Sequence, residues 1–418
     1  MMEMKKYKLG DLLDVKRGTS LSGEYYSTEG EYVRLTCGNF DYTNNSFKEN
    51  TSKDNIFYTG NVREEFIMQK GDIITPLTEQ AIGLLGSTAI IPESNKYIQS
   101  QDVAKIICNE TLLYPLYAFY LISSEIVKKQ LSAAAQQTKI RHTSPDKIKD
   151  CIVWIPELPK QKRIASILSA LDKKIALNRQ INQNLEALAR QLYDYWFVQF
   201  DFPNEKGKPY KSSGGKMVYN PILKREIPEG WENGILSDIA NITMGQSPDG
   251  SSYNEEGDGV IFYQGSTDFG ERFPKIRQYT TAPSRFAKKG DILMSVRAPV
   301  GDLNIANNDC CIGRGLSALN SKVGSITHLY YIMLSFKDMF ERKSAIGTTF
   351  GSINKDELYN LPIIKPTTKI IKLFENKCKP IFDQQMSLGY EIDSLTKQRD
   401  ELLPLLMNGQ VNFDLSAY

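Results

Sequence analysis

The sequence is poor in the residues that build most metal and catalytic centres. Only two histidines occur among 418 residues, and His142 and His328 are too few and too far apart for a histidine metal cluster. The six cysteines are scattered, with neither zinc-type spacing nor the density of a disulfide scaffold, so we interpret them as reduced structural thiols. A complete phosphate-binding loop, an amino-methyltransferase motif and a nuclease-like set of carboxylates are also missing. These absences favour a binding role.

Long apolar runs and a strong net charge are missing as well. The longest apolar stretches, such as residues 112–122, contain Tyr and Pro, so we expect no membrane span, and residues 1–8 lack the apolar core of a signal peptide. A net charge of +2 excludes a polycation that coats nucleic acid, so any contact with nucleic acid needs local basic groups or a partner. We expect a cytoplasmic globular protein with more than one domain.

The chain does contain one sequence pattern that occurs twice. The offset in residue number between matching positions decreases along the chain, as expected when loops differ in length while the elements persist. The matches are Leu9, Asp11 and Gly18 with Leu236, Asp238 and Gly245, residues 70–74 with residues 289–293, and Asp146 to Pro156 with Asp356 to Pro366.

A long helical tract follows each copy, over residues 159–197 and 367–407, with apolar residues alternately four and three apart. This spacing is typical of a coiled coil. Asn178 and Asn182 fall on the seam, where we expect them to set the register. Pro380 lies inside the second tract and predicts a bend or split there.

The apolar face of the first tract is wider than one helical partner needs, because Ile167, Ile181, Leu188 and Tyr195 form a second flank. This width predicts that a further protein docks on the helices. The positions that we expect to pair the helices and dock subunits are Ile164, Leu168, Leu171, Ile175, Ile181, Leu185, Leu188, Leu192, Ile381, Leu388, Ile392, Leu395 and Leu402.

Together these patterns predict an α+β fold in which two mixed globules are separated by two long antiparallel coiled-coil helices, with an internal pseudo-twofold repeat. We predict globules over residues 1–157 and 227–366, a central helix over 158–202, a linker over 203–226 and a C-terminal helix over 367–410. Helices of this length, about 60 Å, would hold two readers at a fixed spacing over two DNA half-sites. The alternative is a coiled-coil spacer between unrelated binding modules.

Several segments resemble the specificity subunits of type I restriction-modification enzymes, in the same order along nearly the whole chain. Residues 161–175 (QKRIASILSALDKKI) and their continuation to Phe197 resemble the central helix of that family. Residues 227–231 (IPEGW), 295–301 (SVRAPVG), 312–316 (IGRGL) and 402–409 (LLPLLMNG) are similar to segments of its second half. The first globule departs more, with residues 75–78 (TPLT) in the place of 295–298 (SVRA).

The resemblance implies that each globule is a target-recognition domain reading one half of a split DNA sequence. It implies that the helices dock two methyltransferase subunits that use S-adenosylmethionine, and that restriction subunits using ATP and Mg can join. This chain would then be the reader in a methyltransferase and endonuclease complex, with no catalytic residue, metal or cofactor of its own.

Polar residues in loops are the candidates for DNA contact, because Gln, Arg and Lys read purine edges while Thr, Ser and backbone amides hold phosphates. The loops before Asp146 and Asp356 are the first choice, although each can also be an ordinary solvated loop. The arginines are as well explained by structural burial. The candidates are Gln137, Thr138, Lys139, Arg141, Thr348, Thr349, Arg34, Arg297, Arg314, Gln264 and Ser266.

Three other functions stay open at this point. A nuclease-methyltransferase with an unrecognised catalytic part would act as an isolated chain. A two-headed scaffold for proteins would show no salt-sensitive affinity for DNA. A reader subunit of a restriction enzyme in which one partner chain both methylates and cleaves would differ only in that partner.

Overall fold

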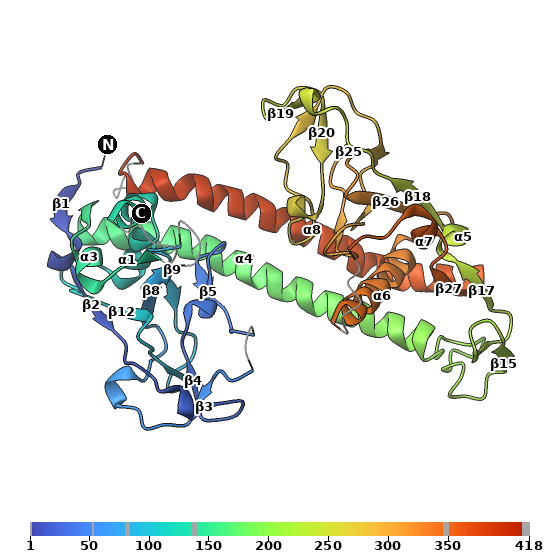
Figure 1. The fold of residues 1–418 in the computed structure, drawn as a ribbon, viewed down its shortest axis with the longest axis horizontal. Helices are drawn as coiled ribbons and strands as arrows, with labels where there is room; N and C mark the ends of the chain where they lie inside the picture. The colour runs from blue at the N-terminus through green and yellow to red at the C-terminus, as the bar shows by residue number, and fades with distance from the viewer. Residues whose placement is uncertain (1, 52–53, 80–83, 135–140, 346–350, 412–418) are drawn as a thin grey trace. The chain divides into compact units, whose positions relative to one another are not determined.

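The computed structural model describes residues 2–51, 54–79, 84–134, 141–345 and 351–411 (Figure 1). The chain forms two compact units, one of residues 1–175 with 394–418 and one of residues 176–393. Each unit therefore contains one globule together with one stretch of each long helix. In the described part of the chain, none of the helices combines the length and the apolar character that a membrane crossing requires.

The first unit is built on a four-stranded antiparallel sheet in the order β10-β8-β12-β2. Alternate side chains of these strands, among them Val15, Ile73 and Ile106, are buried in one core with helix α1, as the two-residue period of a half-buried strand requires. The elements of this layer are β2 (Leu13–Arg17), β8 (Ile73–Pro76), β10 (Ala89–Ile90), β12 (Val103–Cys108), α1 (Pro115–Ile122), α2 (Glu125–Ala134) and α3 (Pro145–Lys149).

A second, smaller sheet of the first unit has the order β11-β4-β7-β3 and contains one parallel pair, β4 with β11. Three two-stranded pairs complete the unit, β1 with β14, β9 with β13 and β5 with β6. The strands are β1 (Lys5–Lys8), β3 (Tyr26–Ser27), β4 (Tyr32–Arg34), β5 (Phe40–Asp41), β6 (Ser46–Phe47), β7 (Phe57–Tyr58), β9 (Thr78–Glu79), β11 (Tyr97–Ile98), β13 (Arg141–His142) and β14 (Ile152–Ile155).

The second unit repeats this plan. Its antiparallel sheet has the order β24-β23-β26-β18, and its second sheet has the order β19-β21-β20-β25-β22 with β20 and β25 parallel. The elements are β17 (Glu232–Ile235), α5 (Leu236–Ile239), β18 (Ala240–Met244), β19 (Tyr253–Asn254), β20 (Val260–Tyr263), β21 (Tyr279–Thr280), β22 (Phe286–Ala287), β23 (Ile292–Ser295), β24 (Leu303–Ile305), β25 (Cys310–Ile312), β26 (Leu316–Ser321), α6 (Ile326–Ala345), α7 (Lys355–Tyr359) and β27 (Pro362–Lys365).

The predicted internal repeat is therefore visible strand by strand. The two antiparallel sheets have the same order, and β1 with β14 corresponds to β17 with β27. Near the end of each globule α3 and α7 begin at Pro145 and Lys355, and the following strands begin at Ile152 and Pro362, so both pairs are 210 residues apart. The α+β class and the two long helices are confirmed.

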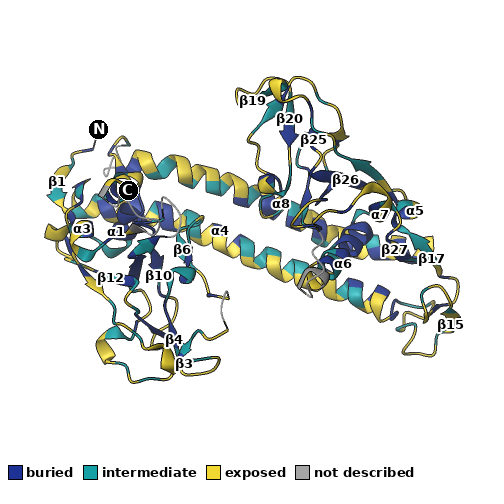
Figure 2. Ribbon diagram, in the orientation of Figure 1, coloured by how far each residue is buried: buried dark blue, intermediate teal, exposed yellow. Residues whose placement is uncertain are grey.

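The long helices lie where the apolar spacing predicts them. Helix α4 covers Leu158–Tyr193 and continues as a short π-helix, η5 (Asp194–Val198), while α8 covers Thr368–Met407. Helix α8 ends at Met407, and Gly409 in the turn after it has a φ of 66°, in the left-handed region that favours glycine. One face of each helix is buried and the other is exposed (Figure 2).

The split expected at Pro380 is wrong, because α8 is one uninterrupted helix through Pro380 and Pro404. A proline removes one backbone hydrogen bond, which costs about 3 kcal/mol when nothing offsets it. Here Cys378 and Phe382 on either side of Pro380 are buried in the core of the second unit, while the Pro380 ring is exposed. Packing of the flanking turns holds the helix together.

Within each unit the stretches of α4 and α8 run antiparallel. In the second unit, Gln385 donates to Glu186 over 2.8 Å, while the earlier Phe374 packs on Phe197, with ring centroids 5.0 Å apart. The side chain of Asn178 is fully buried, as its seam position predicts, and its role in setting the register stays a prediction.

The segment predicted as a linker, residues 203–226, is ordered. It contains most of a hairpin of β15 (Met217–Asn220) and β16 (Arg225–Pro228). Phe202 stacks between Tyr210 and Trp231, with ring centroids 4.6 and 5.0 Å away. An aromatic stack and a hairpin thus hold a segment whose Gly, Lys and Ser content favoured an open loop.

Candidate DNA-recognition surface

Loops from four places in the second unit meet at the end of its two sheets. Gln246, after β18, donates its amide to the Ile312 carbonyl over 3.0 Å. The amide of Gly313 donates to the Tyr263 carbonyl over 2.8 Å, and that of Val296 donates to the Gly315 carbonyl over 2.9 Å. These backbone bonds join segments far apart in the sequence into one continuous edge.

Two glycines allow these loops to cross one another closely. A Cβ atom on Gly245 would lie 2.1 Å from the Gly313 oxygen, and one on Gly315 would lie 2.6 Å from the Gln264 oxygen. No side chain fits at either place, because a real Cβ does not approach a carbonyl oxygen that closely. The backbone of Gln264 therefore lies directly against the loop that carries Arg314.

The side chains on this edge suit nucleic acid. Gln264, Arg297 and Arg314 are exposed, and Ser266 is half-buried. Within the residues that the structure describes, we find no ion pair for either guanidinium group, so both are available to phosphates or base edges. The structure thus brings Gln264, Ser266 and Arg314 together, with Arg297 on the neighbouring strand end.

Sequence reasoning missed Gln246 and Arg285 on the same edge. Both are exposed. The Arg285 carbonyl accepts from Ile312, and Ser284 donates to the Gln246 carbonyl over 2.7 Å. The position after the matched Gly245 was a signal for Gln246, whereas Arg285 has no motif and is placed only by the fold.

The polar loop predicted before Asp356 returns beside Arg297. Arg297 and Ser352 form an antiparallel bridge, and Ala298 donates to the Gly351 carbonyl over 3.2 Å. Thr348 and Thr349 lie outside the described residues. The loop before Asp356 therefore starts from the same edge as the arginines.

The first unit has the same arrangement with other side chains. Arg141 and His142 in β13 pair with Glu79 and Thr78 in β9, so this loop too returns beside the end of the central sheet. Gln137, Thr138 and Lys139 lie outside the described residues. Gly18 repeats the crossing, since its Cβ would lie 2.2 Å from the Ser100 oxygen.

Arg34 is the candidate that the structure places away from solvent. Its side chain donates to the Asn55 carbonyl over 3.3 and 3.1 Å and lies over the Tyr26 ring, 3.9 Å from the centroid. The residue is only 7% exposed. This placement favours the structural alternative, because a buried, fully engaged guanidinium group cannot reach DNA.

The candidate docking residues divide into a seam and an outer face. Five of them are buried, namely Ile164, Leu168, Ile175, Leu388 and Ile392. Seven are half-buried, namely Leu171, Ile181, Leu185, Leu192, Ile381, Leu395 and Leu402.

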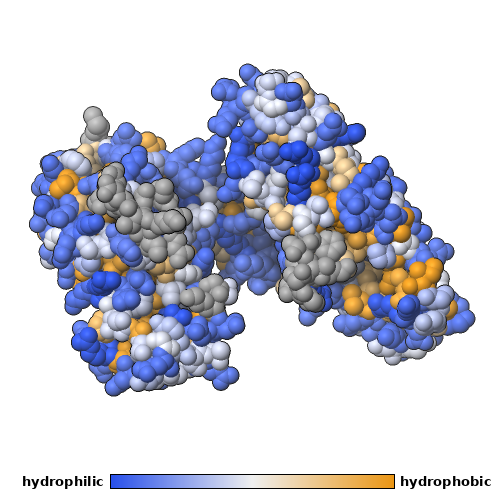
Figure 3. Space-filling model, in the orientation of Figure 1, coloured by the Kyte–Doolittle hydropathy of each residue, from blue (hydrophilic) through white to orange (hydrophobic). Residues whose placement is uncertain are grey.

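Only Leu188 of the predicted docking set is largely exposed, at 52%. Leu177, Tyr195 and Val198 are exposed as well. We call these four residues the apolar stripe. Ile181 extends it at the four- and seven-residue spacing of one helix face. Figure 3 shows that apolar patches reach the surface of the second unit. The predicted second flank is thus partly exposed.

Burial holds two of the cysteine thiols and His328 in their neutral forms. All six cysteines are free, and burial raises the pKa of the Cys310 and Cys378 thiols to about 12, which leaves them protonated and unreactive. Burial lowers the pKa of His328 to about 3, so its imidazole is neutral. Among the described residues, no group of three or more His, Cys, Asp or Glu side chains could hold a metal ion.

Comparison with known proteins agrees with this geometry. The family model described as "Type I restriction modification DNA specificity domain" matches residues 1–187 and 228–400. A putative type I restriction enzyme MjaX specificity subunit of Methanocaldococcus jannaschii is 33% identical, over 72% of this chain and 69% of that protein. The HindI specificity subunit of Haemophilus influenzae is 24% identical, over 98% of this chain and all of that protein.

A solved structure has the same fold. The type I restriction-modification S subunit from M. genitalium superposes with a TM-score of 0.60 at 17% identity, covering 97% of this chain and 96% of that one. Since the family model matches both halves of the sequence, this chain belongs to the specificity subunits of type I restriction-modification systems, the proteins that recognise the DNA sequence.

Proposed function

We propose that this chain reads an asymmetric, bipartite DNA target, with one half-site for each globule. The observation that carries the proposal is that both units share one crossing-loop framework but present different side chains on it. Arg34 pairs with Ile98 as Tyr263 pairs with Ile312.

The residue after the first strand is then Leu35 in one unit and Gln264 in the other. Two residues after the partner strands β11 and β25, the equivalent residues are Ser100 in the first unit and Arg314 in the second. Gln264 and Arg314 present donors and acceptors to solvent, whereas the equivalent Leu35 is fully buried, so the two units should select different bases.

The chemistry of the second edge suits major-groove reading. Arg can bind the O6 and N7 atoms of guanine with both of its terminal groups, and Gln can pair with N6 and N7 of adenine. Arg285 and Arg297 flank these readers and fit phosphates, which hold the domain in register without selecting a sequence. Affinity should then fall steeply as salt rises.

We further propose that the long helices dock two methyltransferase subunits and that restriction subunits join this complex. The apolar stripe supports docking, because the exposed Leu188 and Tyr195 are one heptad apart, and exposed apolar side chains at this spacing favour a further helical partner. In this proposal the methyltransferase uses S-adenosylmethionine, and the restriction subunit uses ATP and Mg. The present chain contributes recognition and no catalytic group.

The experiment on recognition expresses the full chain with its methyltransferase subunit in a host without adenine methylation and maps the methylated adenines. We expect one split motif with two different halves and a constant gap. Methylation of an unsplit or palindromic motif, or none together with salt-insensitive DNA binding, would contradict the proposal.

The experiment on docking compares the variants L188D and Q180D, which both place an Asp on exposed positions of α4. We expect L188D to reduce co-purification of the methyltransferase subunit by about tenfold or more, since a charge in an apolar contact costs at least about 1–3 kcal/mol, and Q180D to leave it unchanged. Equal retention by both variants would place the interface elsewhere.

A further inference from the structure

We propose that Asp268 is a positioning residue for target reading, and that its buried carboxylate sets the turn that presents Gln264 to DNA. In the first domain Asn39 holds the equivalent turn through the backbone amide of Thr36. The inference rests on the proposed function of the edge around Gln264 and Arg314. It adds residues that touch no DNA themselves but determine how faithfully each half-site is read.

The first observation is the turn after β20, a 3₁₀ helix labelled η7 (Ser266–Asp268). Asp268 Oδ2 accepts the backbone amides of Gln264, over 2.7 Å, and of Gly265, over 3.3 Å. Asp268 is 5% exposed, whereas the Gln264 side chain reaches solvent. A buried carboxylate therefore holds the backbone of an exposed candidate reader.

The second observation is that Asp268 also anchors this turn to the next segment. Its Oδ1 atom accepts from Arg277 Nε over 2.9 Å and from Arg277 Nη2, and its carbonyl accepts the Lys275 amide over 2.7 Å. Arg277 Nη2 also donates to Thr267 over 3.2 Å. Such charge-assisted bonds are about twice as strong as neutral ones, so they rigidify the turn at both ends.

The third observation is the equivalent turn in the first unit, η3 (Cys37–Asn39). Asn39 follows Arg34 by five residues, as Asp268 follows Tyr263, and it is fully buried. Its Oδ1 atom accepts the Thr36 amide over 2.9 Å. Two copies of one framework thus keep a buried side-chain acceptor at the same place under the reading edge.

The two residues differ at their second anchor, which explains why one is Asn and the other Asp. Asn39 Nδ2 donates to the Lys48 carbonyl over 3.3 Å, a bond that a carboxylate cannot make. Asp268 instead faces the Arg277 guanidinium group. The variant D268N keeps an oxygen for the Gln264 amide, whereas N39D sets a carboxylate against a carbonyl oxygen.

The experiment maps methylated adenines for the full complex containing D268A, D268N, N39A or N39D. For D268A we expect discrimination between correct and altered bases to fall about tenfold, the size of one lost base contact, in one half of the motif only. D268N should fall between D268A and the wild type, since it restores an acceptor for the Gln264 amide but loses the charge-assisted bonds from Arg277. N39A should relax the other half, and N39D should resemble N39A.

The matched control is D238A, because Asp238 makes the same kind of bond elsewhere in the second unit, accepting the Ile235 amide over 3.1 Å. It should leave both halves of the motif intact. If D268A lowers total methylation but keeps the motif unchanged, or if D238A relaxes it equally, the role of Asp268 is merely structural and the inference is overturned. N39A repeats the test in a separate globule if D268A does not fold.

The two proposals fail in different ways. If the wild-type complex produces no split motif, the proposed bipartite function is wrong whatever the variants do. If the wild type produces it and both D268A and N39A read it with full fidelity, only the positioning role is wrong.

Discussion

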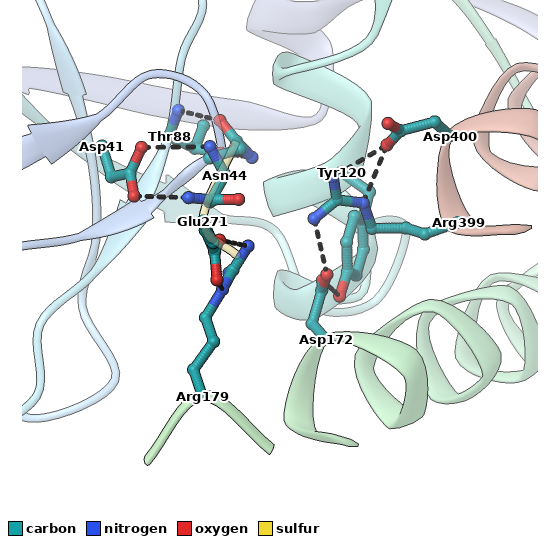
Figure 4. A network of polar contacts seen from close by, with 10 residues as sticks. Asp41, Asn44, Thr88, Tyr120, Asp172, Arg179, Glu271, Arg399 and Asp400 are labelled. Carbon is teal, nitrogen blue, oxygen red and sulfur yellow. Dashed lines mark hydrogen bonds and ion pairs between the residues drawn. The ribbon is translucent and has the colours of Figure 1, made fainter. Parts of the chain in front are cut away.

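Arg399 of α8 donates to Asp172 of α4 over 3.2 Å, inside the first unit (Figure 4). Tyr120 of α1 donates to the other oxygen of the same carboxylate over 2.6 Å, so one Asp side chain joins three helices. The Arg399 side chain is 11% exposed and that of Asp172 is 31% exposed. Burial raises the pKa of Tyr120, which keeps its hydroxyl protonated and able to donate.

We expect D172A to lower the free energy of unfolding by about 1–3 kcal/mol, because the Tyr120 hydroxyl loses its acceptor and the largely buried Arg399 guanidinium group keeps only Asp400 as a partner. Y120F should lower it by only about 1 kcal/mol. Urea unfolding of the full chain measures both changes. An exposed ion pair provides the control, since K379A, which removes the partner of Asp383, should change stability by less than about 0.5 kcal/mol. Equal effects of D172A and K379A would show that the three-helix contact adds nothing.

The crossing glycines give a second prediction. G245A should destabilise the second unit by about 1–3 kcal/mol, since the added methyl group meets the Gly313 carbonyl and forces the backbone to shift. G265A is the matched control in the same edge, because a Cβ there meets nothing within 4 Å. Thermal unfolding of the two variants compares them directly. A midpoint for G245A no lower than that for G265A would contradict the crossing.

The exposed arginines predict the salt dependence of DNA binding. R297A and R285A should weaken binding to every sequence alike and reduce the slope of affinity against salt by about one charge each. R314A should in addition lower the preference for one half-site by about 1–3 kcal/mol. Fluorescence titration with the cognate duplex and one carrying an altered half-site, at several salt concentrations, separates the two effects.

The control for these variants is R342A, which removes an exposed guanidinium group that contacts the Asp338 carbonyl on α6. It should change neither the slope nor the preference. If R342A and R314A behave alike, the edge around Gln264 is not the reading surface.

The sequence predicts most of the framework and only part of the surface. The seam positions and the repeat depend on local spacing, so α4, α8 and the paired sheets could be located from residues such as Leu168 and the match of Gly18 with Gly245. Arg399 lies within the predicted second helical tract, but its contact with Asp172 could not be predicted, because the spacing of one helix carries no information on what the neighbouring helix presents.

The reading edge depends on contacts far apart along the chain, which a single sequence does not encode in any local pattern. Gln246, Arg285 and Arg314 are brought together by loops that cross at the end of both sheets. Arg34 shows the converse, since its place beside a strand fitted a DNA contact and structural burial equally, whereas the Tyr26 ring and the Asn55 carbonyl enclose it. The position of a motif therefore predicts which loop lies near the edge, whereas packing determines which of its side chains are exposed there and which are buried.

His328 predicts how stability responds to acid. Burial lowers its pKa to about 3 in the folded protein, against about 6.5 in the unfolded chain. Below pH 6.5 the unfolded state therefore binds a proton that the folded state does not, so this stabilisation is complete above pH 6.5 and is lost as the pH falls toward 3. Between pH 7 and pH 5 the wild type should lose about 2 kcal/mol more than H328F. Urea unfolding at the two pH values measures the difference. A pH response of H328F equal to that of the wild type would show that His328 is protonated in the folded state.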